Sequence, residues 1–404
     1  TPNPKTNPKP NQTPNPKTNP KPNLNRQGLR NHELSSILLN QPLLSTPTCR
    51  FGKVIPLSKP IVGEEDKTAV LRVLESGMLA QGPEVEAFEE EFSRTVSGHH
   101  CVAVNSGTSA LHLGLLATGI KPGDEVIVPS FTFAATANAV SLCGATPIFV
   151  DIDIDTFTID TEAVSAAITP RTSGIMPVHL YGHPAKMDLL SQIADKHSLM
   201  LFEDAAQAHI AEYQNSPVGT FGTAAFSFYP TKNMTSAEGG MIVTSDPDVA
   251  RKARLLRNQG MEKKYENEVV GFNNRMTDIH AAIGRVQLAS LQMRTDRRRE
   301  IARTYDKNLQ NVTTPFVGDN VIHSYHQYTI RSEYRDSLST HLSNEGVGNG
   351  IYYPTPVHEL PSFDITLDLS NTNLATKEVL SIPIHPFLSN QEVETVIEAV
   401  NSWS

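Results

Sequence analysis

Short apolar runs, mostly separated by stretches with helical spacing, follow one another through the middle of this chain. The runs are Val102–Val104, Glu125–Val128, Pro147–Val150, Gly174–Val178, Leu199–Phe202, Ala224–Phe228 and Met241–Thr244. Runs of this kind alternate with helices in doubly wound α/β folds. The pattern therefore predicts a parallel-rich sheet of seven strands.

The pattern changes toward the carboxyl end of the chain. Helical spacing of apolar residues begins at about Asp278 and predicts a long helix that leads out of the sheet domain. Beyond this helix, Tyr325–Ser332 and Gly350–Tyr353 are predicted strands of a smaller α+β domain. We therefore expect a large domain over residues 54–295 and a small domain over residues 296–404.

Residues 1–53 differ from the rest of the chain. A Pro-, Asn- and Lys-rich segment spans residues 1–12 and is almost repeated over residues 13–23. Such a composition cannot form a packed core, which predicts an extended, disordered tail. The tail has a net charge of about +7 against about −16 for the remainder. It is either an electrostatic tether or, more simply, a translated repeat without a role.

The overall composition is typical of a soluble enzyme. The chain has 404 residues, with 34 basic and 43 acidic residues and a net charge of −9, which argues against a nucleic-acid partner. Cys49, Cys101 and Cys143 show no metal-ligand spacing and fit a reducing compartment. No apolar run is long enough to span a membrane. We expect a cytoplasmic protein without a metal site.

Lys232 follows an apolar run that ends at Tyr229, where Pro230 interrupts the strand pattern. A lysine that is partly removed from water loses some of its preference for the charged form. The uncharged amine attacks aldehydes to form a Schiff base, and pyridoxal phosphate is a cofactor that carries an aldehyde. Taken alone, Lys232 fits a solvated loop lysine better, and the remaining motifs decide between the two interpretations.

Three motifs supply what such a cofactor needs. Gly107, Thr108 and Ser109 come directly after an apolar run and at the start of a helical stretch, where free N–H groups and the helix dipole favour a phosphate. Phe131 follows another run and could stack on a pyridine ring. Alone, the first motif is an ordinary helix cap and the second an ordinary core residue.

Asp204 ends the run that begins at Leu199 and is the candidate partner of the pyridine nitrogen. Glu203 is its rival. Consecutive strand residues face opposite sides of a sheet, so only one of them can face the ring. Asp204 lies nearer the carboxyl end of the strand, where ligands of open α/β sheets bind.

From about Ile55 to its end, the chain resembles the DegT/DnrJ/EryC1/StrS family of sugar-nucleotide aminotransferases. The motifs that carry the resemblance are Gln81–Glu89, Asn105–Leu111, Pro129–Asn138, Glu203–Gln207, Ser227–Asn233, Gly271–Asp278, Tyr325–Tyr328, Gly350–His358 and Leu380–Pro386. The resemblance implies the aspartate aminotransferase fold of type I, with pyridoxal phosphate as cofactor. It also implies ping-pong transfer of an amino group, from glutamate, to a keto-sugar linked to UDP, dTDP or GDP.

Around the cofactor ring, the resemblance implies four residue roles. Lys232 forms the internal aldimine and moves the proton between the substrate carbon and the cofactor. Asp204 pairs with the pyridine nitrogen, Gln207 reaches the ring hydroxyl oxygen, and Phe131 covers one face of the ring.

For the phosphate, the resemblance implies contacts to Gly107, Thr108, Ser109 and Ser227. The neighbouring subunit of a homodimer completes the phosphate site through Asn273 or Arg275. Two positions depart from the family pattern, since Gln259 stands where the family often has histidine and Asn274 where it usually has tyrosine. Both lie on the segment that leads to the contact between subunits and weaken the assignment of Asn273 and Arg275.

His326, Tyr352 and His358 are the candidates for contacts to the sugar or nucleotide. Tyr352 and His358 fit equally well as packing residues around the turn at Pro354 and Pro356. Three rival functions stay open: a sugar dehydratase of the same family, a non-catalytic regulatory paralogue, and a desulfurase or aldolase of the same fold. Lys232 argues against the dehydratase branch, which carries histidine there. Retention of both Lys232 and Asp204 argues against the paralogue, and the chain lacks the reactive cysteine loop of a desulfurase.

Overall fold

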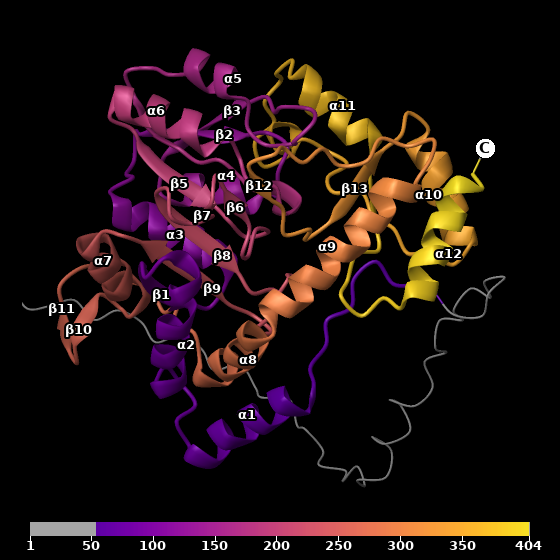
Figure 1. Cartoon of the computed structure of the whole chain (residues 1–404). Coiled ribbons are helices and arrows are strands. Elements are labelled where there is room, and N and C mark those ends of the chain that lie inside the picture. The colour runs from indigo at the N-terminus through magenta and orange to yellow at the C-terminus, as the bar shows by residue number, and fades with distance from the viewer. Residues whose placement is uncertain (1–53, 404) are drawn as a thin grey trace, which may run out of the picture. The chain divides into compact units, whose positions relative to one another are not determined.

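The seven apolar runs form one sheet in the structure, a computed structural model that describes residues 54–403 (Figure 1). Its strands are β1 (His100–Val104), β2 (Glu125–Pro129), β3 (Thr146–Val150), β4 (Thr172–Ile175), β5 (Met200–Asp204), β8 (Thr223–Ser227) and β9 (Gly240–Thr244). The order is β1-β9-β8-β5-β4-β2-β3. Strand β9 is antiparallel to β1 and β8, and the other pairs are parallel. The predicted parallel-rich sheet is confirmed.

Helices cover both faces of this sheet. One face packs against α3 (Gly107–Thr118), α4 (Ala135–Leu142) and α7 (Pro247–Arg257). The other face packs against α2 (Pro83–Ser93), α5 (Thr161–Ala166), α6 (Met187–His197) and α8 (Asp278–Ala289). Strand alternation makes this possible, because Val102 of β1 faces the first group and Ala103 faces the second. The strands are therefore apolar on both faces, as buried parallel strands must be.

Asp278, at the start of α8, caps the beginning of α2. Its carboxylate accepts hydrogen bonds from the backbone N–H groups of Gly82 at 2.7 Å, Val85 at 3.1 Å and Glu84 at 3.3 Å. A carboxylate here satisfies N–H groups that have no partner inside the helix and complements the helix dipole. The contact ties α2 to α8, and α1 (Glu64–Ser76) packs on α8 through Ala69 and Val73.

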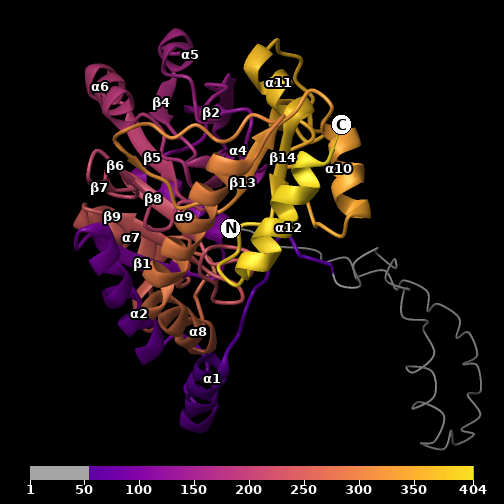
Figure 2. The same cartoon turned by 45° about the vertical axis from the view of Figure 1, so that its right-hand side comes forward.

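A second group of elements follows α8. It comprises α9 (Leu291–Asn308), β13 (Tyr328–Arg331), α10 (Arg335–Asn344), α11 (Ser370–Glu378), β14 (Val379–Ile382) and α12 (Asn390–Asn401). Strands β13 and β14 form an antiparallel pair. Figure 2 shows α10 and α12 beside this pair. Apolar side chains of α9, β13, β14, α10 and α12 share one hydrophobic cluster.

Two details differ from the sequence-based expectation. The long helix predicted from Asp278 is interrupted at Ser290, which separates α8 from α9. The backbone N–H of Ser290 donates to the Gln287 carbonyl at 3.2 Å. The strand predicted at Gly350–Tyr353 is wrong: only Gly350 makes a bridge, to Ser381 of β14. The segment that pairs with β13 is Val379–Ile382. It overlaps the Leu380–Pro386 motif, in which two prolines obscure the strand pattern.

The remaining strands are short. They are β6 (Glu212–Tyr213), β7 (Ser216–Pro217), β10 (Met261–Lys263), β11 (Glu266–Asn267) and β12 (Val321–Ile322). Within residues 54–403, no helix combines the length and apolarity that a bilayer crossing requires. The predicted tail over residues 1–53 lies outside the described residues. The predicted domain boundary between residues 295 and 296 falls inside α9 and stays a prediction.

Candidate active site

Several of the predicted site residues lie at the carboxyl edge of the parallel strands. Asp204 is the last residue of β5, and Ser227 is the last residue of the neighbouring strand β8. Gly107 opens α3, directly after β1. A side chain at position 107 would begin only 2.7 Å from Cβ of Ser227, so glycine is required for this close approach. Residues from three separate motifs therefore meet at one edge.

Lys232 lies in a tight turn after β8, where its N–H donates to the Tyr229 carbonyl at 2.9 Å. The side chain is half-buried. Burial lowers the pKa of its amine to about 8, although the negative charge of Asp204 opposes the shift. More of the amine is therefore uncharged at neutral pH than for a solvated lysine, and the uncharged amine is the nucleophilic form.

Asp204 faces Lys232 from a buried position. Its side chain is 4% exposed and accepts hydrogen bonds from Thr136 Oγ1 at 2.7 Å and from the Ala206 N–H at 3.2 Å. Burial raises the pKa of this carboxyl, and the hydrogen bonds and Lys232 only partly counter the effect. A buried carboxylate with this environment is suited to pair with a further positive group.

Glu203 points to the other side of β5 and is fully buried. Its carboxylate accepts from the N–H groups of Gly219 at 2.7 Å, Phe221 at 2.9 Å and Gly222 at 3.0 Å, and lies 3.1 Å from Nε2 of His179. Nδ1 of His179 accepts from the Ala185 N–H, so Nε2 carries the proton that Glu203 receives. Glu203 thus holds the loop before β8 and has no capacity left for a ligand, which removes it as the rival of Asp204.

The start of α3 forms a cradle beside Ser227. Ser106 caps the helix by accepting from the Ser109 N–H at 3.1 Å, and their hydroxyls lie 3.0 Å apart. Thr108 is exposed, Ser109 is half-buried, and Ser227 is buried. Gly240 also adjoins the cradle, since a Cβ there would lie 2.3 Å from the Ser106 carbonyl oxygen. The arrangement leaves backbone N–H groups and hydroxyls available to an anion.

Gln207 connects two tyrosines at the same edge. Its Oε1 accepts from the Tyr181 N–H at 2.7 Å, and its Nε2 donates to the Tyr353 hydroxyl at 3.2 Å. The side chain amide is therefore held in one orientation, with one N–H still available. The predicted contact between Gln207 and a ring hydroxyl stays a prediction.

The two phenylalanines of the Pro129–Asn138 motif lie in opposite environments. Phe131 is fully buried, and its ring centroid lies 6.1 Å from that of Phe157 and 6.4 Å from that of Tyr353. Phe133 is 58% exposed, with its ring centroid 5.9 Å from that of Tyr353. Phe131 packs in the core, which argues against its predicted role, and Phe133 is the aromatic ring that a ligand can reach.

Arg275 adjoins the end of β1, and Asn273 makes a backbone bridge to Asn258. Arg275 makes a backbone bridge to Val104 and donates from Nη1 to Asn258 Oδ1 at 2.7 Å. The side chain of Asn273 is exposed. Their predicted action on a neighbouring subunit stays a prediction.

Comparison with known proteins identifies the family of this chain. The sequence model of the DegT/DnrJ/EryC1/StrS aminotransferase family matches residues 60–401. The chain belongs to this family. The enzyme is 43% identical over 349 residues to the dTDP-3-amino-3,4,6-trideoxy-alpha-D-glucose transaminase of Streptomyces venezuelae, which covers 84% of this chain and 92% of the relative.

Solved structures of aminotransferases share the fold. DesV of S. venezuelae, solved with a ketimine intermediate, superposes with a TM-score of 0.83 at 41% identity and covers 86% of this chain and 99% of its own. NtdA of Bacillus subtilis, solved with bound cofactor PMP, superposes with a TM-score of 0.80 at 30% identity and covers 86% and 84%.

The predicted substrate residues of this aminotransferase separate into two groups. His326 is near Lys232, and its Nδ1 lies 3.3 Å from Asn233 Oδ1. Burial lowers the pKa of His326 well below its ordinary value, so its ring is neutral at physiological pH. Tyr352 is half-buried, and its carbonyl accepts a hydrogen bond from the Tyr181 hydroxyl. Both remain candidates for substrate contact.

His358 does not reach the site. It is fully buried, its Nδ1 lies 2.5 Å from Ser130 Oγ, and its ring centroid is 6.2 Å from that of Phe149. These contacts hold the turn at Pro354–Pro356 against the end of β2. The burial therefore argues against a contact between His358 and the substrate and supports the packing role.

Thr136 and Tyr353 are site residues that the motifs did not single out. Thr136 orients Asp204, and Thr132, four residues before it, lies 3.0 Å from its hydroxyl. The sequence feature that could have indicated Thr136 is its spacing of four residues from Thr132. Tyr353 contacts both Gln207 and Phe133, which no local pattern indicates.

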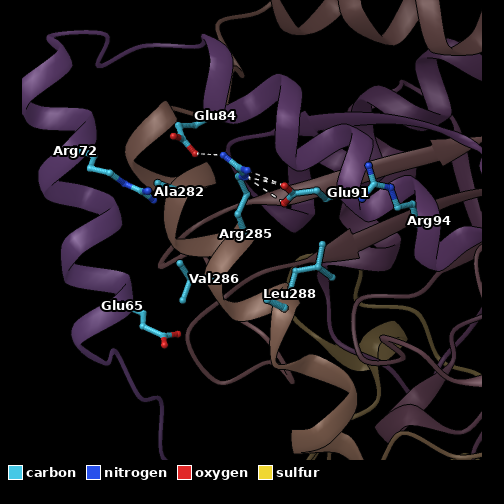
Figure 3. Close-up of a pocket in the computed structure, with 10 residues that line it drawn as sticks. Glu65, Arg72, Glu84, Glu91, Arg94, Ala282, Arg285, Val286 and Leu288 are labelled. Carbon is cyan, nitrogen blue, oxygen red and sulfur yellow. Dashed lines mark hydrogen bonds and ion pairs between the residues drawn. The ribbon is translucent and has the colours of Figure 1, made fainter.

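A cavity of about 460 Å³ opens elsewhere, between α1, α2 and α8 (Figure 3). Its arginine Arg285 is paired on both sides, with Nη1 2.6 Å from Glu84 Oε2 and Nη2 2.7 Å from Glu91 Oε1. None of the predicted site residues lines it. The acidic and basic side chains that line the cavity balance one another, and the ion pairs of Arg285 join α8 to α2.

Proposed function

We propose that this enzyme transfers an amino group from glutamate to a keto-sugar carried on a nucleotide, with pyridoxal phosphate as cofactor. The observation that carries the proposal is that Lys232, whose pKa is lowered to about 8, interacts electrostatically with the buried carboxylate of Asp204 at the carboxyl edge of the sheet. The transaminase of S. venezuelae, 43% identical, supports dTDP as the nucleotide.

The residues present fit the chemistry of pyridoxal phosphate. An amine of lowered pKa suits its aldehyde, and a buried carboxylate suits a protonated ring nitrogen. The glycine at position 107 keeps the start of α3 open beside Ser227, which suits a phosphate. The group itself supplies an electron sink for the carbanion that forms when a proton leaves the substrate carbon.

The chain's own residues then perform four tasks. Lys232 Nζ would accept the proton from the substrate carbon and donate it to the cofactor carbon on the other side of the transferred nitrogen. Asp204 keeps a proton on the ring nitrogen, because its own charge is otherwise uncompensated in a buried site. Ser109 and Ser227 bind phosphate oxygens. Gln207 orients the ring from the side of Tyr181.

We assign the ring-stacking role to Phe133 in place of Phe131. Replacement of Phe133 with alanine is expected to weaken cofactor binding about 3- to 10-fold, the range of an aromatic contact. Replacement of Phe131 with alanine is expected instead to lower the stability of the apoprotein by about 3–5 kcal/mol, because it opens a cavity in the core. Titration with pyridoxal phosphate and thermal unfolding measure the two effects. Reversed outcomes for the two variants would restore the first assignment.

A homodimer is part of the proposal. The side chain of Asn273 is exposed, so it is available to complete the phosphate site of a second subunit. Large apolar side chains are exposed on α1, with Leu71 at 56% and Leu74 at 50%, and just after it, with Met78 at 52%, which supports an association surface. Amination is preferred over dehydration because Lys232 provides the amine that the dehydratase branch lacks.

The function is tested with dTDP-, UDP- and GDP-linked keto-sugars and glutamate. We expect at least one sugar to gain an amino group, detected by mass, and sedimentation of the same sample to show a dimer. Loss of a sugar oxygen without gain of nitrogen would instead identify a dehydratase. Failure of glutamate to convert the bound cofactor would exclude the donor we propose, and a monomer with full activity would exclude the shared site.

A further inference from the structure

A small cavity of about 20 Å³ adjoins Lys232 on the side of α9. It is enclosed by residues 58–61, residues 230–235, the α8–α9 region and residues 386–387. Four cationic side chains line it: Lys59, Lys232, Arg294 and Arg298. No aspartate or glutamate is among its lining residues. A wall of cations without a carboxylate favours an anion.

Arg298 is the most buried of these cations, at 6% exposure. Its Nη1 donates to the carbonyls of Tyr325 at 3.2 Å and Ile384 at 3.1 Å, and its Nε has no hydrogen-bond partner among the described residues. No carboxylate forms an ion pair with it in the described part of the chain. Burial without a counter-charge lowers the pKa of Arg298 to about 10, and Arg294 adds to the effect.

Other arginines of the structure are balanced differently. Arg257 is as buried as Arg298, at 5% exposure, but forms an ion pair with Glu89. Arg285 lies between two glutamates (Figure 3). A buried guanidinium without an anion is unfavourable, and such a group is retained where a ligand supplies the anion. Arg298 therefore lies where a ligand-binding residue is expected, and it lacks the counter-charge that a ligand would supply.

The neighbouring cations are less buried, and the carboxylates of Asp66 and Glu65, which lie outside the cavity lining, act on Arg294. Arg294 packs with its guanidinium 5.6 Å from the centre of the Phe387 ring and donates from Nη1 to Gln287, and Lys59 is exposed. Lys59 is therefore the exposed cation of the cavity lining and Arg298 the buried one, and Lys232 lines the same cavity. The volume accommodates about one or two water-sized groups, which suits a carboxylate better than the diphosphate of a nucleotide.

We propose that Arg298, with Arg294 and Lys59 at the entrance, binds the α-carboxylate of the amino donor while the donor reacts at Lys232. The α-carboxylate is one bond from the carbon that carries the amine, so the residue that binds it must adjoin the catalytic lysine. A planar guanidinium also binds a carboxylate through two parallel hydrogen bonds, which fixes the orientation of that carbon. The inference rests on the proposed function and names the residues for its donor.

The test compares Arg298→Gln with Arg303→Gln, which lies on the exposed side of the same helix. The holoenzyme reacts with glutamate alone, and the change in cofactor absorbance gives the affinity for the donor. We expect Arg298→Gln to weaken glutamate binding by about 100-fold, Arg298→Lys to recover part of it, and Arg303→Gln to match the wild type. The preference for glutamate over its α-amide is expected to fall with Arg298→Gln. Affinity for dTDP is expected not to change.

Three outcomes overturn the assignment: weakened dTDP binding with unchanged glutamate binding, no change in either, or an unchanged preference against the α-amide. If Arg298→Gln does not fold, Arg294→Gln and Lys59→Gln replace it, each with an expected loss of about 5- to 10-fold, and an unchanged affinity overturns the assignment. Calorimetric binding of glutarate to the holoenzyme separates this inference from the function. A wild type that binds glutarate through Arg298 but aminates no sugar contradicts only the function, and one that does not bind glutarate contradicts the site.

Discussion

Replacement of Lys232 with alanine is expected to lower turnover by at least about 10³-fold, because one side chain supplies both the covalent link to the cofactor and the proton transfer. The dialysed protein is also expected to lose its visible absorbance. Turnover with glutamate and the accepted keto-sugar measures the first effect, and a spectrum measures the second. The prediction depends on the half-buried position of Lys232 beside Asp204.

Lys196→Ala is the matched control, since Lys196 is an exposed lysine at the end of α6. It is expected to leave both turnover and absorbance unchanged. The pKa of about 8 also sets a pH dependence: the uncharged amine of Lys232 increases as pH rises through 8. Covalent capture of the cofactor by the apoprotein should therefore accelerate up to about pH 8 and then level off. A rate that keeps rising toward pH 10 would indicate a solvated lysine, and turnover within tenfold of the wild type in Lys232→Ala would exclude the proposed chemistry.

Replacement of Asp204 with asparagine is expected to lower turnover by about 10²- to 10³-fold in the donor and acceptor half-reactions alike. The amide keeps the shape of the side chain and can still accept from one of its two donors, Thr136 and Ala206, but it cannot compensate a charge on the ring nitrogen. Single-turnover absorbance changes measure each half-reaction separately. A loss confined to one half-reaction would contradict a role at the cofactor ring.

Glu203→Gln is the control on the opposite face of the same strand. It removes charge from a carboxylate that holds Gly219, Phe221 and Gly222, so we expect a lower melting temperature with activity retained by the folded fraction. Asp204→Asn should behave in the opposite way in the apoprotein. The pKa of Asp204 is raised in the folded state, so its contribution to stability is lost as pH rises through that pKa. At neutral pH, the asparagine apoprotein is therefore expected to be at least as stable as the wild type.

All seven strands of the sheet were predictable, because each is an apolar run short enough to exclude a helix and is bounded by turn residues. The errors lie where the local pattern is ambiguous. Helical spacing of apolar residues continues across Ser290. The break between α8 and α9 depends on the backbone of this one residue, so the sequence periodicity does not reveal it. Gly350–Tyr353 has the aromatic composition of a strand, but β13 pairs with Val379–Ile382.

Within the site, strand alternation predicted that Asp204 and Glu203 face opposite sides of the sheet, since the period of two is a property of the backbone. No such rule separates Phe131 from Phe133. Both follow the end of β2, and residues two apart in an extended chain point to the same side. Their environments differ through Phe157 and Tyr353, which come from other segments. His358 is a similar case, since its burial depends on Ser130 and Phe149.

The sequence by itself determined the family, the strands of the sheet, and the positions of Lys232, Asp204 and the Gly107–Ser109 helix start, because these depend on local order along the chain. The tertiary structure alone decided which aromatic ring is exposed, that His358 is packed away, and that Arg298 lacks a counter-charge. Exposure and charge balance are sums over neighbours that are distant in sequence. They exist only once the chain has folded.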